Sequence, residues 1–271
     1  MALVSMEKLL EKAHEQAYAV GGFNVFNFET MGAVIEVAEE LKSPVILGLP
    51  ERLFKFVDVD LLGVAMVRAA NRSSVPISIH LDHSHSYEGI MRAIRWGFTS
   101  VMFDGSTLSY EDNVKKTREI AKIAHALGIS VEGELSGRGE AHLTKDKVAE
   151  FVEKTRIDAL AIGVGTEYNS KNNETRLRQL REIKEVAGVP FVLHGFSKDG
   201  LTGNSYRPYI EVGVSKINVA TDMSSAAAAT LKEELKIHPD ANYIHLMTEV
   251  KKGVKESVRR YILGFGSFAK I

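Results

Sequence analysis

Four residues that could bind a metal ion or move a proton lie close together in one short segment. The stretch "HLDHSH" holds His80, Asp82, His83 and His85 at the end of an apolar run that is typical of a buried strand. Imidazole and carboxylate groups are ligands of Zn²⁺ and similar divalent ions, and they also act as general acids and bases. The chain has no cysteine, so thiolate sites and disulfides are excluded. This segment therefore predicts part of a metal site or an active site.

A second group of such residues follows two later strand-like runs. His194 ends "FVLH" and could present a ring nitrogen to the same ion as His83. Directly after it, Gly195 permits close backbone approach and Ser197 offers a hydroxyl, as Thr221 does at the end of "NVAT". A helix that begins at Asp222 would present free N–H groups to an anion. These features favour a phosphate site beside the metal.

Strand-like and helical runs alternate along the chain and would position these groups. Two folds fit such a pattern, a (β/α)8 barrel and a doubly wound sheet. Eight units with no linker rich in proline, glycine or serine favour one (β/α)8 barrel, a TIM barrel, over residues 1–271 with a C-terminal helical extension. The expected strands are 21–27, 44–49, 77–82, 100–105, 130–135, 159–165, 191–195 and 216–221.

The alternation inside the strands predicts which side chains face the barrel interior. In residues 77–82, the isoleucines and Leu81 share one face, while Ser78, His80 and Asp82 share the other. The outer face of a barrel strand packs on helices and must be apolar, so the polar face should point inward. Polar residues also end several strands, at the face where such barrels carry their active sites: Asp82, Asp104, Glu134, His194 and Asn218.

Composition excludes several classes of partner. The net charge of the 271-residue chain is −1, so no overall field favours nucleic acid or an anionic membrane surface. Apolar runs are too short to span a bilayer. The first residues, "MALVSMEKLLEKAHEQ", are typical of an amphipathic helix rather than of a secretory or transit signal. We expect a cytoplasmic protein.

The motifs resemble those of the class II fructose-bisphosphate and tagatose-bisphosphate aldolases, with the tagatose type most similar. The similarity runs nearly end to end and is most specific in "HLDH", "GFTSVMFDGSTLSYEDNVKKTREIAKIAHALGISVEGEL", "FVLHG" and "VSKINVATD". It implies a TIM barrel in which Asp82 exchanges a proton with the oxygen of the reacting aldehyde. It also implies that His83 and His194 ligate a divalent metal, Zn²⁺ above all. The phosphate of dihydroxyacetone phosphate would be held by Gly195, Ser197, Asn218 and Thr221.

The resemblance further implies the reaction and the assembly. Such enzymes are lyases that cleave a phosphorylated ketose into dihydroxyacetone phosphate and an aldehyde, or run the reverse addition. They are usually homodimers or homotetramers.

Two departures from the family pattern bear on the chemistry. After the sixth strand the family reads Ile-Gly-Thr-Ala-His-Gly, and the histidine is the third metal ligand. The segment "VGTEYN" (164–169) instead places Tyr168 there, and a neutral phenol is a poor ligand because its pKa is near 10. Other candidates for the third ligand are Glu167, Glu134, His85 and His142. The family's acidic loop after the fifth strand is also shortened to residues 136–147, with Glu140 and His142 as the nearby bases.

Three interpretations follow from these departures. The protein is an aldolase with a rebuilt metal site, or a sugar-phosphate-binding homologue that has lost catalysis. The third possibility is metal-independent chemistry through a Schiff base on Lys216 or Lys198, which requires a desolvated lysine.

Overall fold

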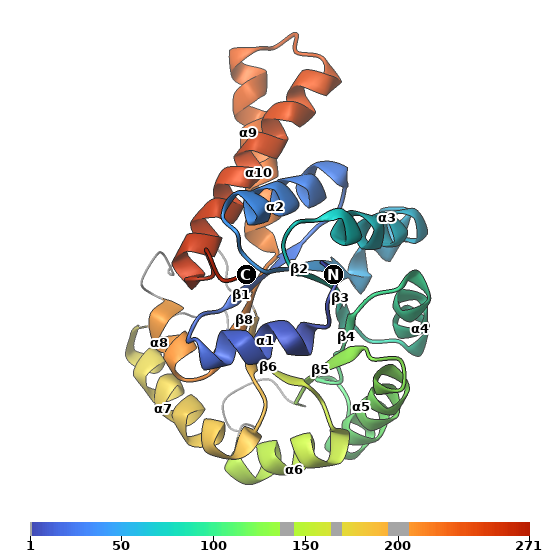
Figure 1. Ribbon diagram of the computed structural model, residues 1–271, viewed down its shortest axis with the longest axis vertical. Helices are drawn as coiled ribbons and strands as arrows, with labels where there is room; N and C mark the ends of the chain where they lie inside the picture. Colours follow the sequence, from blue (N-terminus) through green and yellow to red (C-terminus); the bar gives the residue numbers. More distant parts are fainter. Residues whose placement is uncertain (1, 136–143, 164–169, 195–205) are drawn as a thin grey trace.

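The computed structural model describes residues 2–135, 144–163, 170–194 and 206–271. Its centre is a closed barrel of parallel strands whose spatial order follows the chain, β1 to β8 (Figure 1). This confirms the predicted TIM barrel. The strands are β1 Val20–Asn24, β2 Val45–Pro50, β3 Ile77–Ser84, β4 Ser100–Phe103, β5 Ser130–Glu134, β6 Ala159–Gly163, β7 Phe191–His194 and β8 Val214–Val219.

Helices surround the barrel and are well defined at their first turns. Side chains of Asn27, Asp58, Ser86 and Ser109 each accept a backbone N–H bond at the start of a helix, which satisfies a donor that the helix itself cannot pair. The helices are α1 Met6–Glu15, α2 Phe28–Glu40, the 3₁₀ turn η1 Glu51–Lys55, α3 Val59–Arg72, α4 Tyr87–Trp96, α5 Tyr110–His125, α6 Lys145–Thr155, α7 Ser170–Ala187, α8 Arg207–Glu211, α9 Thr221–Ile237 and α10 Tyr243–Phe265.

The barrel interior is apolar at one end and polar at the other. Helix α1 crosses the end where the strands begin, and its Met6 and Leu10 cluster with Val20, Ile46 and Val192 from inside the barrel (Figure 1). Toward the other end the inward faces carry buried polar groups. The outer strand faces belong to the large core shared with the helices. The alternation predicted for β3 is therefore observed, and the polar layer lies between the α1 plug and the carboxyl ends of the strands.

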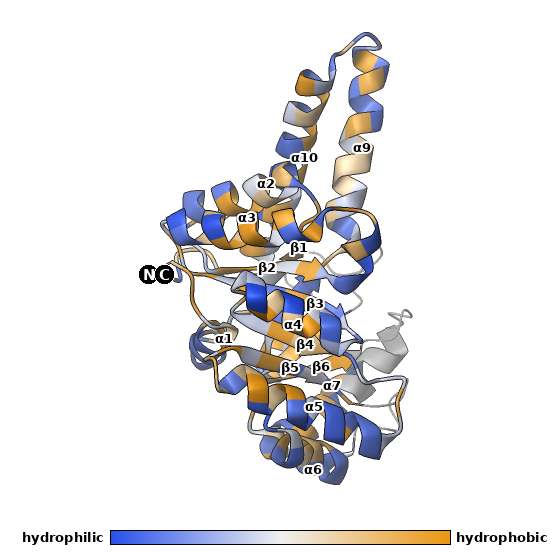
Figure 2. Cartoon of the chain, turned by 90° about the vertical axis from the view of Figure 1, so that its right-hand side faces the viewer, coloured by the Kyte–Doolittle hydropathy of each residue, from blue (hydrophilic) through white to orange (hydrophobic). Residues whose placement is uncertain are grey.

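Helices α9 and α10 form a hairpin that extends well beyond the barrel (Figures 1 and 2). Its base is fixed to α2, because Lys251 and Lys255 pair with Glu36 while Lys255 and Arg259 pair with Glu40. The hairpin is the helical C-terminal extension expected from the sequence. Among the described residues, no helix is long and apolar enough to span a membrane.

Candidate active site

Asp82 lies inside the barrel near the end of β3, and two asparagines fix its carboxylate. The Asn24 amide donates to Oδ2 at 2.9 Å, and the Asn218 amide donates to Oδ1 at 3.0 Å. Asp82 is only 2% exposed. Burial opposes its negative charge, but the fields of His83 and His194 outweigh that effect and lower the pKa of Asp82. The carboxylate is thus ionised and oriented.

Two glycines on the neighbouring strands make room for these asparagines. A Cβ atom added at Gly48 would lie 2.3 Å from Asn24 Oδ1, and one added at Gly22 would lie 2.6 Å from Asn218 Oδ1. Both separations are far below van der Waals contact. Glycine at these positions on β2 and β1 is therefore required for the two amides to reach Asp82.

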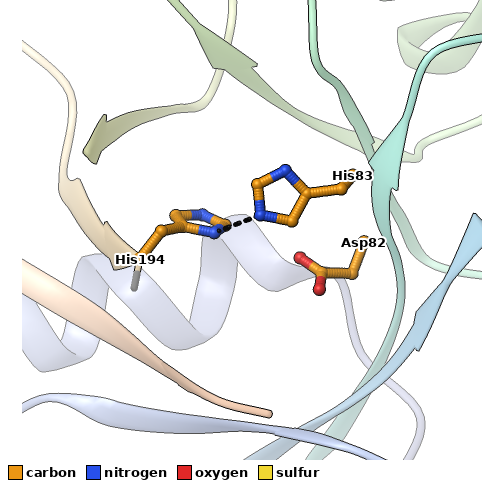
Figure 3. Close-up of side chains that lie close together, drawn as sticks. All are labelled: Asp82, His83 and His194. Atoms are coloured by element: carbon orange, nitrogen blue, oxygen red, sulfur yellow. Dashed lines mark hydrogen bonds between the residues drawn. The ribbon is translucent and has the colours of Figure 1, made fainter. Parts of the chain in front are cut away.

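An irregularity in β3 turns the His83 side chain toward the interior. Continued alternation would point it outward, with Ile79 and Leu81. Instead the register with β4 shifts between Leu81 and Ser84, and His83 has a φ of 46°, a left-handed conformation that non-glycine residues seldom adopt. Bulges of this kind re-aim side chains and are frequent beside active sites. Here the bulge brings His83 next to Asp82 (Figure 3).

His83 and His194 face each other across the barrel with their lone pairs converging. His83 Nδ1 contacts Asp104 Oδ2 at 2.9 Å, and His194 Nε2 contacts Glu132 Oε1 at 2.6 Å. A carboxylate can only accept, so each of these nitrogens carries the proton. The remaining nitrogens, His83 Nε2 and His194 Nδ1, are 2.9 Å apart (Figure 3). Two such lone pairs repel unless a proton or a cation lies between them.

The electrostatic surroundings of His83 favour positive charge at this point. Burial disfavours an imidazolium, but the hydrogen bond to Asp104 and the negative charges of Asp82 and Glu134 outweigh it and raise the pKa of His83 to about 9. Asp82, His83 and His194 each offer a ligand atom, and the three atoms lie within 4.8 Å of one another. This donor set of two imidazoles and a carboxylate fits a divalent metal ion.

The buried ion pair of Glu132 and Lys216 contacts the His194 ring at Nε2. Glu132 is fully buried, accepting from His194 through Oε1 and from Lys216 Nζ through Oε2 at 2.6 Å. Burial raises the pKa of Glu132, but Lys216 and His194 outweigh burial and lower it. His80 lies 3.6 Å from Glu132 and stays neutral, because burial and the Lys216 charge lower its pKa to about 3. Carboxylates behind histidines orient the rings in known metal sites.

Glu134 lies on the other side of the His83 ring. Its Oε2 is 3.9 Å from His83 Nδ1 and is buried with no hydrogen-bond partner among the described residues. Burial and the nearby Asp104 charge raise the pKa of Glu134. Glu134, Asp104 and His83 form a second group of convergent donors. In this arrangement Glu134 approaches Nδ1 of His83 rather than the Nε2 that faces His194.

The structure brings together Asp82, His83, His194 and Asn218, all expected at the site. Both amide hydrogens of Asn218 are directed inward, toward Asp82 and toward His194 Nδ1 at 3.2 Å. Thr221 is exposed at the first residue of α9. Several predicted residues lie outside the described residues: Glu140, His142, Glu167, Tyr168, Gly195, Ser197 and Lys198.

Asn24 is a site residue that sequence reasoning missed. The signal available was a polar side chain on an otherwise apolar strand, "VGGFN". Its partner Asp82 comes from β3, two strands away, so the contact depends on the pairing of β1, β2 and β3 and on the space above Gly48.

Comparisons with known proteins identify the family of the chain. The model of the family "Fructose-bisphosphate aldolase class-II" matches residues 4–270. The chain is 36% identical to a Bacillus subtilis protein named "Probable fructose-bisphosphate aldolase", over 98% of this chain and 99% of that one. The crystal structure of the YdjI aldolase from Escherichia coli K12 matches with a TM-score of 0.88 and 34% identity, covering 99% of both chains. The chain therefore belongs to the class II fructose-bisphosphate aldolase family.

Proposed function

We propose that the protein is a metal-dependent lyase that reversibly cleaves a phosphorylated ketose into dihydroxyacetone phosphate and an aldehyde. One observation carries the proposal beyond family membership. Two imidazole lone pairs converge beside a buried, ionised carboxylate at the carboxyl end of the strands. That is the end where barrels of this type do their chemistry.

We assign the metal to His83 and His194, with Zn²⁺ as the preferred ion. A divalent cation held there would act as a Lewis acid on the oxygens of the three-carbon fragment. Asp104 and Glu132 would orient the two rings so that His83 Nε2 and His194 Nδ1 are unprotonated and face the metal. For the third ligand, Tyr168, Glu167 and His142 stay predictions. Glu134 faces the opposite nitrogen of His83 and would need that ring to turn.

In this proposal Asp82 moves the proton at the oxygen of the departing aldehyde. In cleavage its carboxylate accepts the proton of the ketose hydroxyl as the adjacent carbon–carbon bond breaks. In the reverse direction the same proton returns to the aldehyde oxygen as the bond forms. The hydrogen bonds from Asn24 and Asn218 hold the carboxylate in position for both steps.

We place the phosphate of the substrate at the start of α9, beside Thr221, together with Gly195 and Ser197. The first turn of this long helix offers unpaired N–H groups and the positive end of the helix dipole. Asn218 is part of the family motif "VSKINVATD", and its contact with the substrate phosphate stays a prediction. Its amide donates to the Asp82 carboxylate, which favours positioning of Asp82 as its role.

The phosphate assignment predicts a loss of affinity. In a Ser197→Ala, Thr221→Ala double variant, we expect dihydroxyacetone phosphate to bind at least about tenfold more weakly, because each lost hydrogen bond to a charged group contributes roughly 1.5–3 kcal/mol. Calorimetric titration measures this. Thr230→Ala is the matched control, since Thr230 lies on the same helix and its hydroxyl donates to the Ala226 carbonyl of that helix. Equal affinity in the double variant and the wild type would refute the assignment.

Metal removal gives a second test. Protein stripped with a chelator should lose cleavage of fructose or tagatose bisphosphate, and added Zn²⁺ or another divalent ion should restore it. His83→Ala and His194→Ala should not recover, whereas His125→Ala should, because His125 pairs with Asp158 far from the site. Full activity in the stripped protein would contradict the proposal and favour the Schiff-base route.

The structure offers little support for that alternative at Lys216. The Lys216 amine is buried and ion-paired to Glu132, and a protonated amine is no nucleophile. Lys198 lies outside the described residues. A sugar-phosphate-binding homologue without activity remains the other outcome, and phosphate affinity without turnover in the metal-loaded protein would identify it.

We also propose that residues 1–271 are one domain, that the protein is cytoplasmic, and that it forms a homodimer or homotetramer. The projecting hairpin supports the assembly, because Tyr243 and Ile244 at its tip are 71% and 78% exposed. Large apolar side chains gathered at such a projection favour contact with another protein surface.

A further inference from the structure

We infer that the tip of the α9–α10 hairpin is a second divalent-metal site, formed by Glu234, His238 and His245. Each residue offers one ligand atom, and these atoms lie within 4.8 Å of one another. Glu234 lies in α9, His238 directly follows that helix, and His245 lies in α10, at the tip of the hairpin that projects from the barrel (Figures 1 and 2). The site is independent of the proposed function.

The local structure directs all three side chains to one point. Glu234 lies in the last turn of α9, and His238, the residue after the helix end, still donates its backbone N–H to the Glu234 carbonyl at 2.8 Å, which places the two side chains on the same side. His245 lies in the first turn of α10, where its backbone N–H is held by the Asn242 side chain at 2.9 Å. The two imidazole rings meet edge to face with centroids 5.5 Å apart. The turn between the helices thus brings two histidines to one carboxylate.

The two histidines approach the Glu234 carboxylate at different distances. His245 Nε2 is 2.7 Å from Glu234 Oε1, which one hydrogen bond explains. His238 Nε2 lies 3.6 Å from the same oxygen, too far for a hydrogen bond. Two ligands of a tetrahedral zinc ion at about 2.0–2.1 Å from the metal lie roughly 3.4 Å apart. For an ion to bind between the three groups, the distance from His245 Nε2 to Glu234 Oε1 would have to increase from 2.7 Å to roughly 3.4 Å.

At the tip of the hairpin, the charged neighbours paired with Glu234 are the two histidines. Its side chain is 15% exposed, and in the described part of the chain its ion pairs are with the two imidazoles alone. Two lysines of the hairpin have other partners, since Lys236 pairs with Glu233 and Lys252 pairs with Glu249. A shielded carboxylate beside two imidazole nitrogens is a donor set that Zn²⁺ accepts, with water completing the coordination.

Bound metal would join the ends of α9 and α10. The test uses the full-length protein equilibrated with Zn²⁺, dialysed against metal-free buffer and analysed for zinc per chain. In the His83→Ala, His194→Ala background, which removes the proposed active-site donors, we expect one zinc to remain. Adding His238→Ala and His245→Ala should remove it. Adding His125→Ala should not, because His125 has the same kind of histidine–carboxylate contact, to Asp158, but belongs to no group of three donors among the described residues.

A second measurement keeps the inference testable if that background does not fold. In the otherwise wild-type protein, the His238→Ala, His245→Ala variant should hold one zinc fewer per chain. Zn²⁺ should also slow amide exchange in residues 234–245 only when both histidines are present. Equal zinc content in the two proteins, or zinc lost on dialysis with no change in exchange, would overturn the inference.

Discussion

Asp82→Asn should lower aldol cleavage by at least about a hundredfold while leaving the fold and phosphate affinity nearly intact. General acid–base groups contribute about 10²–10⁴-fold to rate, and an amide cannot accept the proton that the departing aldehyde gives up. The expected signature is a fall in kcat with little change in the affinity for dihydroxyacetone phosphate.

The site can accept this amide without unfolding. Asn24 and Asn218 both donate to the Asp82 carboxylate, so a new NH₂ group would face a donor. However, Asn218 Oδ1 is buried with no hydrogen-bond partner among the described residues, and a turn of that amide would present it as an acceptor. The variant should therefore melt close to the wild type.

Asp158→Asn is the matched control for a structural carboxylate. Asp158 accepts from the Val131 N–H at 2.6 Å and from His125 Nε2 at 2.9 Å, just before β6 begins and thus at the opposite end of the barrel. It should lose about 1–3 kcal/mol of unfolding free energy and keep its turnover. If Asp82→Asn behaves like this control, destabilised but fully active, its catalytic role is wrong.

The barrel could be predicted from sequence because its strands alternate in one way: apolar side chains face the helices, and the side chains between them face the barrel interior. Residues 77–82 illustrate this: the apolar face lies in the outer core, and Ser78, His80 and Asp82 lie inside. Strand ends also predicted which polar groups meet, since closure of a parallel barrel gathers them at one face. Asp82, Asp104, Glu134, His194 and Asn218 meet there as expected.

The orientation of the donors could not be predicted, because it depends on contacts between strands. His83 points inward through a bulge and a left-handed φ that no local pattern signals. The ring nitrogen of His83 that stays free is set by Asp104, which directly follows β4, and that of His194 is set by Glu132 on β5. Lys216 could be read from sequence as a nucleophile, and only its pairing with Glu132 gives it a different role.

That pairing makes Glu132 a positioning residue, and its removal should weaken metal binding at His83 and His194. Glu132→Gln alone leaves the Lys216 ammonium buried without a counter-charge, and breaking a buried pair in this way costs about 3–5 kcal/mol. Adding Lys216→Met removes the stranded charge and should restore much of that stability. Thermal melts of the two variants measure the difference.

In the stable double variant, Glu132→Gln with Lys216→Met, we expect the site at His83 and His194 to bind Zn²⁺ about 10–100-fold more weakly, the usual effect of losing a carboxylate behind a metal-binding histidine. The amide oxygen can still accept from His194 Nε2, but without the charge that makes this 2.6 Å contact strong. The ring is then less firmly held with Nδ1 unprotonated. Competition with a zinc-sensitive dye measures the affinity, and Lys154→Met, which breaks an exposed pair with Glu150 on α6, is the control. Wild-type zinc affinity in the double variant would show that His194 is oriented by packing alone, and Glu132 would then be a structural residue.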